Sequence, residues 1–70
     1  MGVVMRYFAT DRDGRPHTLY RFEVADSGIV EERWTPTGWV FSSVPSEHLF
    51  EGKHDLWELT YSTARMFFPI

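Results

Sequence analysis

The sequence predicts a small α+β domain in which a four-stranded antiparallel β-meander is followed by two short helices. Three observations lead to this prediction. Residues 18–25 alternate apolar and charged side chains, as a strand with one buried face does. Turn signals separate such runs at Asp13-Gly14, Asp26-Ser27-Gly28 and Thr35-Pro36-Thr37-Gly38. The second half of the chain carries helix-start and helix-stop residues instead.

Four runs in the first part of the chain have the composition of strands. They are residues 3–9, 18–25, 29–34 and 39–42. The first run is rich in β-forming residues, and Asp13-Gly14 is a strong hairpin signal after it. Pro16 has no N–H to donate, so it marks the edge of the second strand and not its centre.

The register of the second and third predicted strands decides which side chains share a face. We expect Ala25 to lie opposite Ile29, which gives an apolar face of Tyr20, Phe22, Val24, Val30 and Trp34. The opposite face then carries four charged residues, Arg21, Glu23, Glu31 and Arg33. A shift by two residues would place Glu23 opposite Arg33 and improve the electrostatics. Both registers keep the same faces, because only an odd slip exchanges them.

Glu32 does not fit the apolar face, because it falls in phase with Val30 and Trp34. One interpretation is a bulge or an edge strand that lets the carboxylate reach water. The other interpretation is a partly buried carboxylate with a raised pKa in a functional site. The sequence leaves both interpretations open.

A first helix of about two turns is expected after the strands. Ser43 suits the N-cap, Pro45 the first turn, and Glu47 the positive end of the helix dipole. Gly52 suits the left-handed position that ends a helix.

The tail, residues 56–70, fits two periodicities. Trp57, Tyr61, Ala64 and Phe68 form a helical stripe, whereas residues 57–61 also alternate as a strand does. We favour a short extended piece at residues 57–59 and a second helix from 61 to 68. Thr60 would cap this helix.

Length and composition predict one domain, residues 1–70, with a marginal hydrophobic core. No cysteine is present, so disulfides and thiolate metal sites are excluded. Three Trp, three Tyr and six Phe indicate either rich packing or a self-associating surface. The chain shows neither a signal peptide nor an apolar run long enough for a membrane span, and a cytoplasmic location is expected.

No catalytic template is present in the sequence. There is no phosphate-binding glycine loop, no zinc-type spacing and no nucleophile elbow. His48 and His54 are six residues apart and do not share a helical face, so surface histidines are favoured over a metal site. We expect a protein that is not an enzyme and binds no cofactor. The enzymatic alternative is a site completed across a dimer with Glu32.

The favoured function is a protein-interaction module or adaptor that binds another protein or forms a homodimer. The candidate binding residues are the charged face and the apolar C-terminus, namely Arg21, Glu23, Glu31, Arg33, Phe67 and Phe68. The uncharged segment 66–70 should be buried in the chain's own core or in an interface.

The alternative is a nucleic-acid-associated regulatory protein, because residues 6–8 and 19–22 combine arginine with aromatic side chains. A formal charge of −3 makes nucleic acid an unfavoured partner.

The chain resembles small uncharacterised proteins of actinobacteria and their phages. The resemblance spans most of the chain and lies in Tyr20-Arg21, Glu32-Arg33-Trp34, Gly38-Trp39 and the closing Thr60 to Ala64. At the acidic position of that pattern, two before the alanine, this chain has Ser62. The resemblance implies an α+β fold and a function outside core metabolism, and it implies no site residue.

Overall fold

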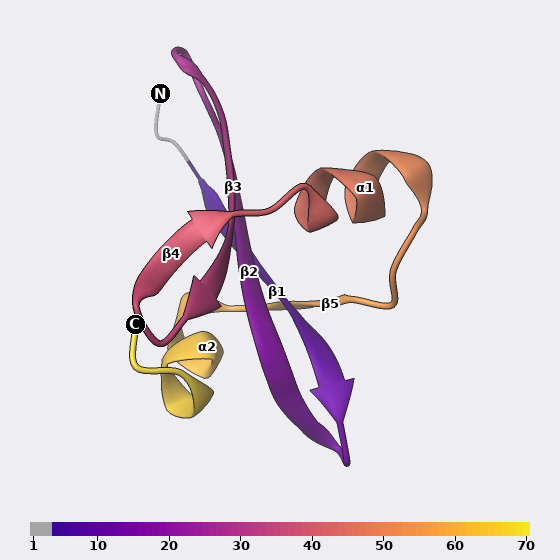
Figure 1. Ribbon diagram of the computed structural model, residues 1–70, viewed down its shortest axis with the longest axis vertical. Helices are drawn as coiled ribbons and strands as arrows, with labels where there is room; N and C mark the ends of the chain where they lie inside the picture. The colour runs from indigo at the N-terminus through magenta and orange to yellow at the C-terminus, as the bar shows by residue number, and fades with distance from the viewer. Residues whose placement is uncertain (1–3) are drawn as a thin grey trace.

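The computed structural model describes residues 4–70 and shows an antiparallel sheet with two short helices (Figure 1). The strands are β1 (Met5–Arg12), β2 (Arg15–Ala25), β3 (Gly28–Thr35), β4 (Gly38–Phe41) and β5 (Trp57–Leu59). The helices are α1 (Val44–Glu51) and α2 (Tyr61–Phe67). The α+β class is confirmed. Residue 3, where we expected the first strand to begin, lies outside the described residues.

The sheet has five strands in the order β4-β3-β2-β1-β5, one more than predicted. The first four form the expected meander. The extended piece expected at residues 57–59 is a strand that returns beside β1 and pairs Leu59 with Tyr7 and Trp57 with Ala9. Three residues are too short a run to reveal a pairing partner in the sequence, because the partner lies about fifty positions away.

The predicted turns have the backbone conformations that their residues favour. Asp13 and Gly14 both have positive φ, 55° and 77°, as the central residues of a type I′ hairpin do. Gly38, which follows the Pro36-Thr37 turn, has a φ of 119°. Here the local sequence determines the chain reversal.

The predicted register of β2 and β3 is wrong by one residue. Ala25 lies opposite Gly28 and not Ile29, because the connecting loop contains two residues, Asp26 and Ser27. This odd slip exchanges the faces of one strand relative to the other. Tyr20, Phe22 and Val24 therefore share a face with Ile29, Glu31 and Arg33, whereas Arg21 and Glu23 share the other face with Val30, Glu32 and Trp34.

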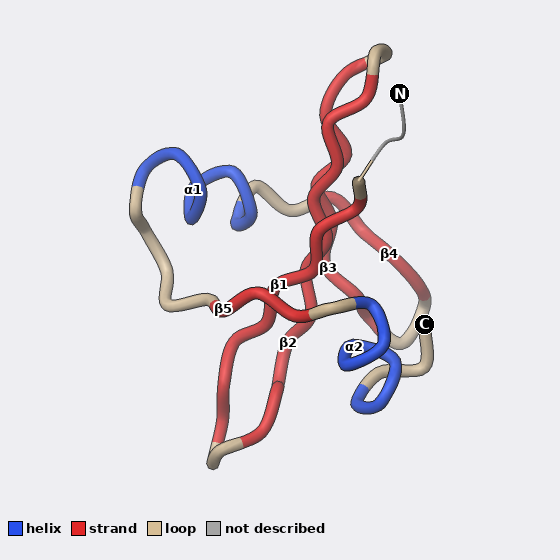
Figure 2. The backbone as a smooth tube through the Cα atoms, turned by 180° about the vertical axis from the view of Figure 1, so that it is seen from behind, coloured by secondary structure: helices blue, strands red, loops and turns tan. Residues whose placement is uncertain are grey.

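Each face of the sheet carries a small core, and the two helices lie on opposite sides of the sheet (Figures 1 and 2). The α1 face holds Phe8, Tyr20, Phe22 and Leu56, against which Val44 and Leu49 pack. The α2 face holds Ala9, Leu19, Leu59 and Ala64, against which Tyr7, Trp34, Trp39, Phe68 and Ile70 pack. The chain thus divides its few buried side chains between two layers.

The helix ends follow the predicted residues with one difference. Thr60 caps α2, because its hydroxyl accepts a hydrogen bond from the Thr63 N–H at 3.1 Å. Gly52 ends α1 with a φ of 68°. Ser43 occupies the N-cap of α1 but makes no side-chain cap bond. The carboxylate of Glu31, on β3, accepts the Ser46 N–H at 3.0 Å instead.

The burial of the two layers gives the first prediction. Leu19 has no exposed surface, so Leu19→Ala should lower the free energy of unfolding by about 2–5 kcal/mol. Met66, whose surface is 77% exposed, is the matched control, and Met66→Ala should change it by less than about 0.5 kcal/mol. Urea unfolding followed by circular dichroism measures both values. Equal losses in the two variants would contradict the burial described here.

Candidate functional site

The four charged residues proposed as one recognition face do not lie on one face. The odd register places Arg21 and Glu23 on the α2 face, and Glu31 and Arg33 on the α1 face. The prediction of a shared charged surface is therefore wrong. Two of the four side chains also have partners within the chain. Arg21 binds Glu32, and Glu31 binds the backbone of α1.

Arg21, Glu32 and Trp39 form a polar and aromatic cluster on the α2 face. Arg21 lies directly opposite Glu32, and its Nε donates to Glu32 Oε1 at 2.8 Å while its terminal nitrogen Nη2 donates to the same oxygen. The guanidinium also lies 4.2 Å from the centre of the Trp39 ring. About a quarter of each charged side chain is exposed. Glu32 thus shares its face with Val30 and Trp34, as predicted, because Arg21 neutralises it there.

Aromatic rings continue this cluster across the α2 face. Trp34 meets Trp39 edge to face at 5.2 Å between ring centres. Tyr7 lies 6.5 Å from Trp39 and 5.5 Å from Tyr61, the first residue of α2. Burial raises the pKa of Tyr7, and the nearby charge of Arg21 opposes this increase. These rings come from three strands and a helix, so their main effect is to hold the sheet together.

A second Arg–Glu pair lies on the α1 face and is more exposed. Arg6 and Glu58 form two parallel hydrogen bonds, 2.9 Å from Nε to Oε2 and 2.8 Å from Nη2 to Oε1. The hydrogen bonds from Arg6 hold the pKa of Glu58 below its ordinary value. The pair links β1 to the short edge strand β5.

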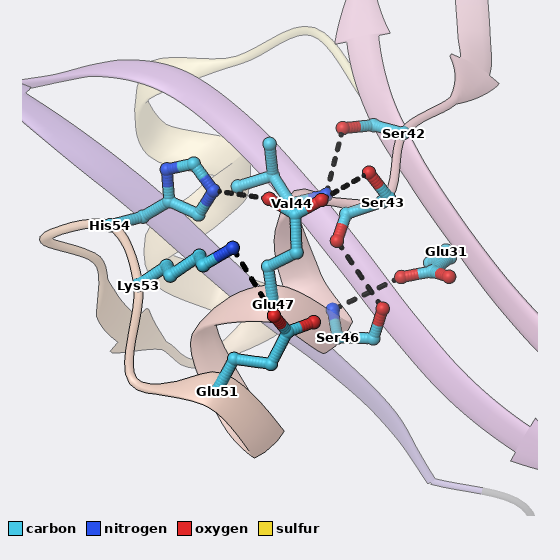
Figure 3. A network of polar contacts seen from close by, with 9 residues as sticks. All are labelled: Glu31, Ser42, Ser43, Val44, Ser46, Glu47, Glu51, Lys53 and His54. Carbon is cyan, nitrogen blue, oxygen red and sulfur yellow. Dashed lines mark hydrogen bonds and ion pairs between the residues drawn. The ribbon is translucent and has the colours of Figure 1, made fainter.

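A polar network surrounds the first turn of α1 (Figure 3). Glu47 accepts a hydrogen bond from the Ser43 hydroxyl at 2.6 Å and pairs with His54 at 2.7 Å. These hydrogen bonds, with His54 first, lower the pKa of Glu47. His54 has a left-handed φ of 67°, and Lys53 donates its N–H to the carbonyl of Glu47. The network therefore ties the loop after α1 back to the start of that helix.

The three histidines do not form a site together. His17 is exposed, and His54 is bound to Glu47. His48 is half-buried against Phe8, 5.5 Å between ring centres, and its Nδ1 has no hydrogen-bond partner within residues 4–70. In the same part of the chain no three His, Asp or Glu side chains are grouped closely enough to hold a metal ion. The expectation that all three histidines are solvated is wrong for His48.

The C-terminal segment divides between core and surface. Phe68 and Ile70 pack against the core of the α2 face. Phe67 is 48% exposed and Met66 is 77% exposed. Of the two C-terminal residues predicted to bind a partner, Phe68 therefore belongs to the core and Phe67 is available to one. A shallow depression beside them is lined by Tyr61, Ser62, Arg65 and Met66.

The strand β4 is the apolar edge of the sheet (Figure 2). Its residue Phe41 is 75% exposed, and the neighbouring Val40 is partly exposed. Residues 34–46 contain no charged side chain. The predicted meander also has its fourth strand at an edge, but the binding residues expected from the sequence did not include Val40 or Phe41.

The comparisons with known proteins assign neither a family nor a function to the chain. No family model, no curated protein and no solved structure matches the chain. Within residues 4–70, neither helix has the length and hydropathy to cross a membrane. The surfaces described above therefore have to be interpreted from their own chemistry.

The two Arg–Glu pairs offer a matched comparison by double-mutant cycles. We expect a coupling free energy of about 1–3 kcal/mol between Arg21 and Glu32, because the pair is largely screened from water and stacks on Trp39. The exposed pair Arg6–Glu58 should give less than about 1 kcal/mol. The variants Arg→Met and Glu→Gln, singly and together, are measured by urea unfolding. A larger coupling for Arg6–Glu58 would contradict this ranking.

The lowered pKa of Glu47 gives a pH dependence with a defined sign. Its folded-state pKa lies below the ordinary value of 4.5, so the carboxylate stabilises the fold above about pH 5, and this stabilisation is lost as the pH falls through the lowered pKa. The stability difference between the wild type and Glu47→Gln should therefore shrink between about pH 5 and pH 3. Urea midpoints at several pH values measure it. A constant difference across this range would speak against the hydrogen bonds to His54 and Ser43.

Proposed function

We propose that this chain is a small protein-interaction module that acts by binding another polypeptide and not by catalysis. The supporting observation is the distribution of its apolar side chains. Eight hydrophobic residues are buried, whereas ten large hydrophobic side chains are exposed within residues 4–70. Exposed apolar side chains that lie next to one another are typical of binding surfaces.

Several of the exposed apolar residues lie in three areas. The first is the end of the β2–β3 hairpin, where Val24 pairs with Ile29. The second is the β4 edge, with Val40 and Phe41. The third is the exposed surface of α2, with Met66 and Phe67. None of these areas is needed for the two cores, so their hydrophobic character favours a partner.

Four charged residues support the same proposal because the chain uses them internally. Arg21, Glu31, Glu32 and Glu47 each bind another group of the same chain. A bound ligand would have to displace these partners. The exposed apolar areas suit a protein partner better than a small ionic ligand.

The contacts do not favour the nucleic-acid alternative. Its two candidate segments depend on Arg6 and Arg21, and these side chains are paired with Glu58 and Glu32. The aromatic residues beside them, Phe8, Tyr20 and Phe22, are buried and have no free ring face for a base. The enzymatic alternative depended on Glu32. This carboxylate is paired with Arg21, so the contacts do not favour that alternative either.

Site-specific photo-crosslinking tests the proposal. A benzophenone amino acid replaces Val24, Phe41 or Phe67 in turn, one in each apolar area, and a matched control replaces the exposed His17 near the polar β1–β2 turn. In cells that produce the chain, at least one apolar position should form a crosslinked product with a polypeptide, and position 17 should not. If no apolar position gave more product than position 17, the proposed function would be wrong.

A further inference from the structure

We infer that the partner at the β4 edge is a second copy of this chain, joined by antiparallel pairing of β4 with β4. This inference rests on the proposed function and specifies one partner for it. The resulting dimer would contain a continuous ten-stranded sheet, because five strands come from each copy.

The backbone of β4 presents free hydrogen-bonding groups along its outer side. Val40 pairs with Arg33 of β3, and the Ser42 N–H donates to the Glu31 carbonyl at 3.2 Å. Peptide groups alternate in direction along an antiparallel strand. The backbone N–H and C=O groups of residues 40 and 42 point toward β3. The N–H and C=O groups of Trp39 and Phe41 therefore point away from the sheet. These groups can bind an added strand.

Symmetry restricts how two β4 strands can pair. A two-fold axis perpendicular to the sheet keeps the α1 faces of both copies on one side, so opposed residues must come from the same face. Trp39 and Phe41 lie on the α2 face, because they pair with Trp34 and Glu32. A pairing centred on Val40 places Trp39 of each copy opposite Phe41 of the other, and each such pair exchanges two hydrogen bonds. A pairing centred on Trp39 would oppose Phe41 to a turn residue.

The side chains fit the pairing centred on Val40. Phe41, which is 75% exposed in one copy, comes beside Trp39 of the other copy, and aromatic pairs across strands are stabilising. The two Val40 side chains meet on the axis. No charged residue occurs between Trp34 and Ser46, so two copies of net charge −3 meet along an uncharged seam.

The two helices pack mainly on other strands than β4. Helix α1 begins after β4 but packs on β2 and β3, and α2 packs on β1 and β5. The opposite edge of the sheet differs, because β5 carries the charged Glu58. Charges are a device that protects an edge from pairing, and β4 is uncharged.

A charge-swap experiment tests the inference, because the Val40 side chains of the two copies face each other across the two-fold axis. The seam is short, so light scattering covers protein concentrations from about 10 µM to about 1 mM. The wild type and the uncharged β-branched control Val40→Thr should dimerise. Val40→Lys and Val40→Glu should each weaken the dimer at least about tenfold, and their equimolar mixture should dimerise again as a mixed pair. Circular dichroism verifies that each variant is folded.

Amide hydrogen exchange gives a second readout. In the wild type, the Trp39 and Phe41 amides should become protected as the concentration rises, whereas the Val40 amide, bound to β3, should be protected throughout. A wild type that stays monomeric at the highest concentration, or a mixture that does not dimerise, would overturn the inference.

The outcomes separate this inference from the proposed function. If the chain self-associates and Phe67→Glu abolishes the dimer while Val40→Lys does not, the partner surface is α2, and only the β4 inference fails. If the wild type is monomeric but crosslinks from Phe41 or Phe67 to a different protein, the inference again fails alone. A monomer without crosslinks at any apolar position would overturn both.

Discussion

The two-residue turn at Asp26 and Ser27 sets the register in which Arg21 lies opposite Glu32, and the rest of the α2 face depends on this pair. An isolated carboxylate beside Trp34 would be costly to desolvate. Arg21 removes that cost by binding Glu32, and its guanidinium then provides a flat surface on which Trp39 lies. Trp39 in turn contacts Trp34 and Tyr7 and so joins β4 to the centre of the sheet. One cross-strand ion pair therefore allows aromatic rings to cover a face that contains charge.

Local chemistry was sufficient to predict most of the secondary structure. The turns at Asp13-Gly14 and Pro36-Thr37, the cap at Thr60 and the stop at Gly52 each depend on residues adjacent in the chain, and each is observed. The relation between strands was not predictable in the same way. A loop of two residues and a loop of three fit the sequence Asp26-Ser27-Gly28 almost equally well, yet they assign opposite faces to the partner strand. The predicted charged surface was lost through this single ambiguity. The extended piece at residues 57–59 was predicted, but its pairing with β1 was not, because that pairing is non-local.

The lengths of the helices and strands explain why so many apolar side chains remain exposed to solvent. An eight-residue helix such as α1 is about 12 Å long, whereas the eleven-residue strand β2 extends over about 36 Å. One short helix on each face covers the middle of the sheet and cannot reach the hairpin ends (Figure 1). At the β1–β2 end the sequence compensates with charged and polar residues. At the β2–β3 end it does not, since Val24 and Ile29 are exposed there.

Several charged and aromatic residues thus have roles opposite to those that the sequence pattern suggests. Polar residues that look suited to recognition are used to hold the chain together: Arg21 and Glu32 within the sheet, Glu31 and Glu47 at the start of α1. Aromatic residues that look suited to a core, such as Phe41 and Phe67, lie outside it. This chain has little buried volume, and its partly buried ion pair Arg21–Glu32 also holds two strands in register. Its apolar residues then exceed what two thin cores can accommodate, and the excess becomes the surface that a partner chain can cover.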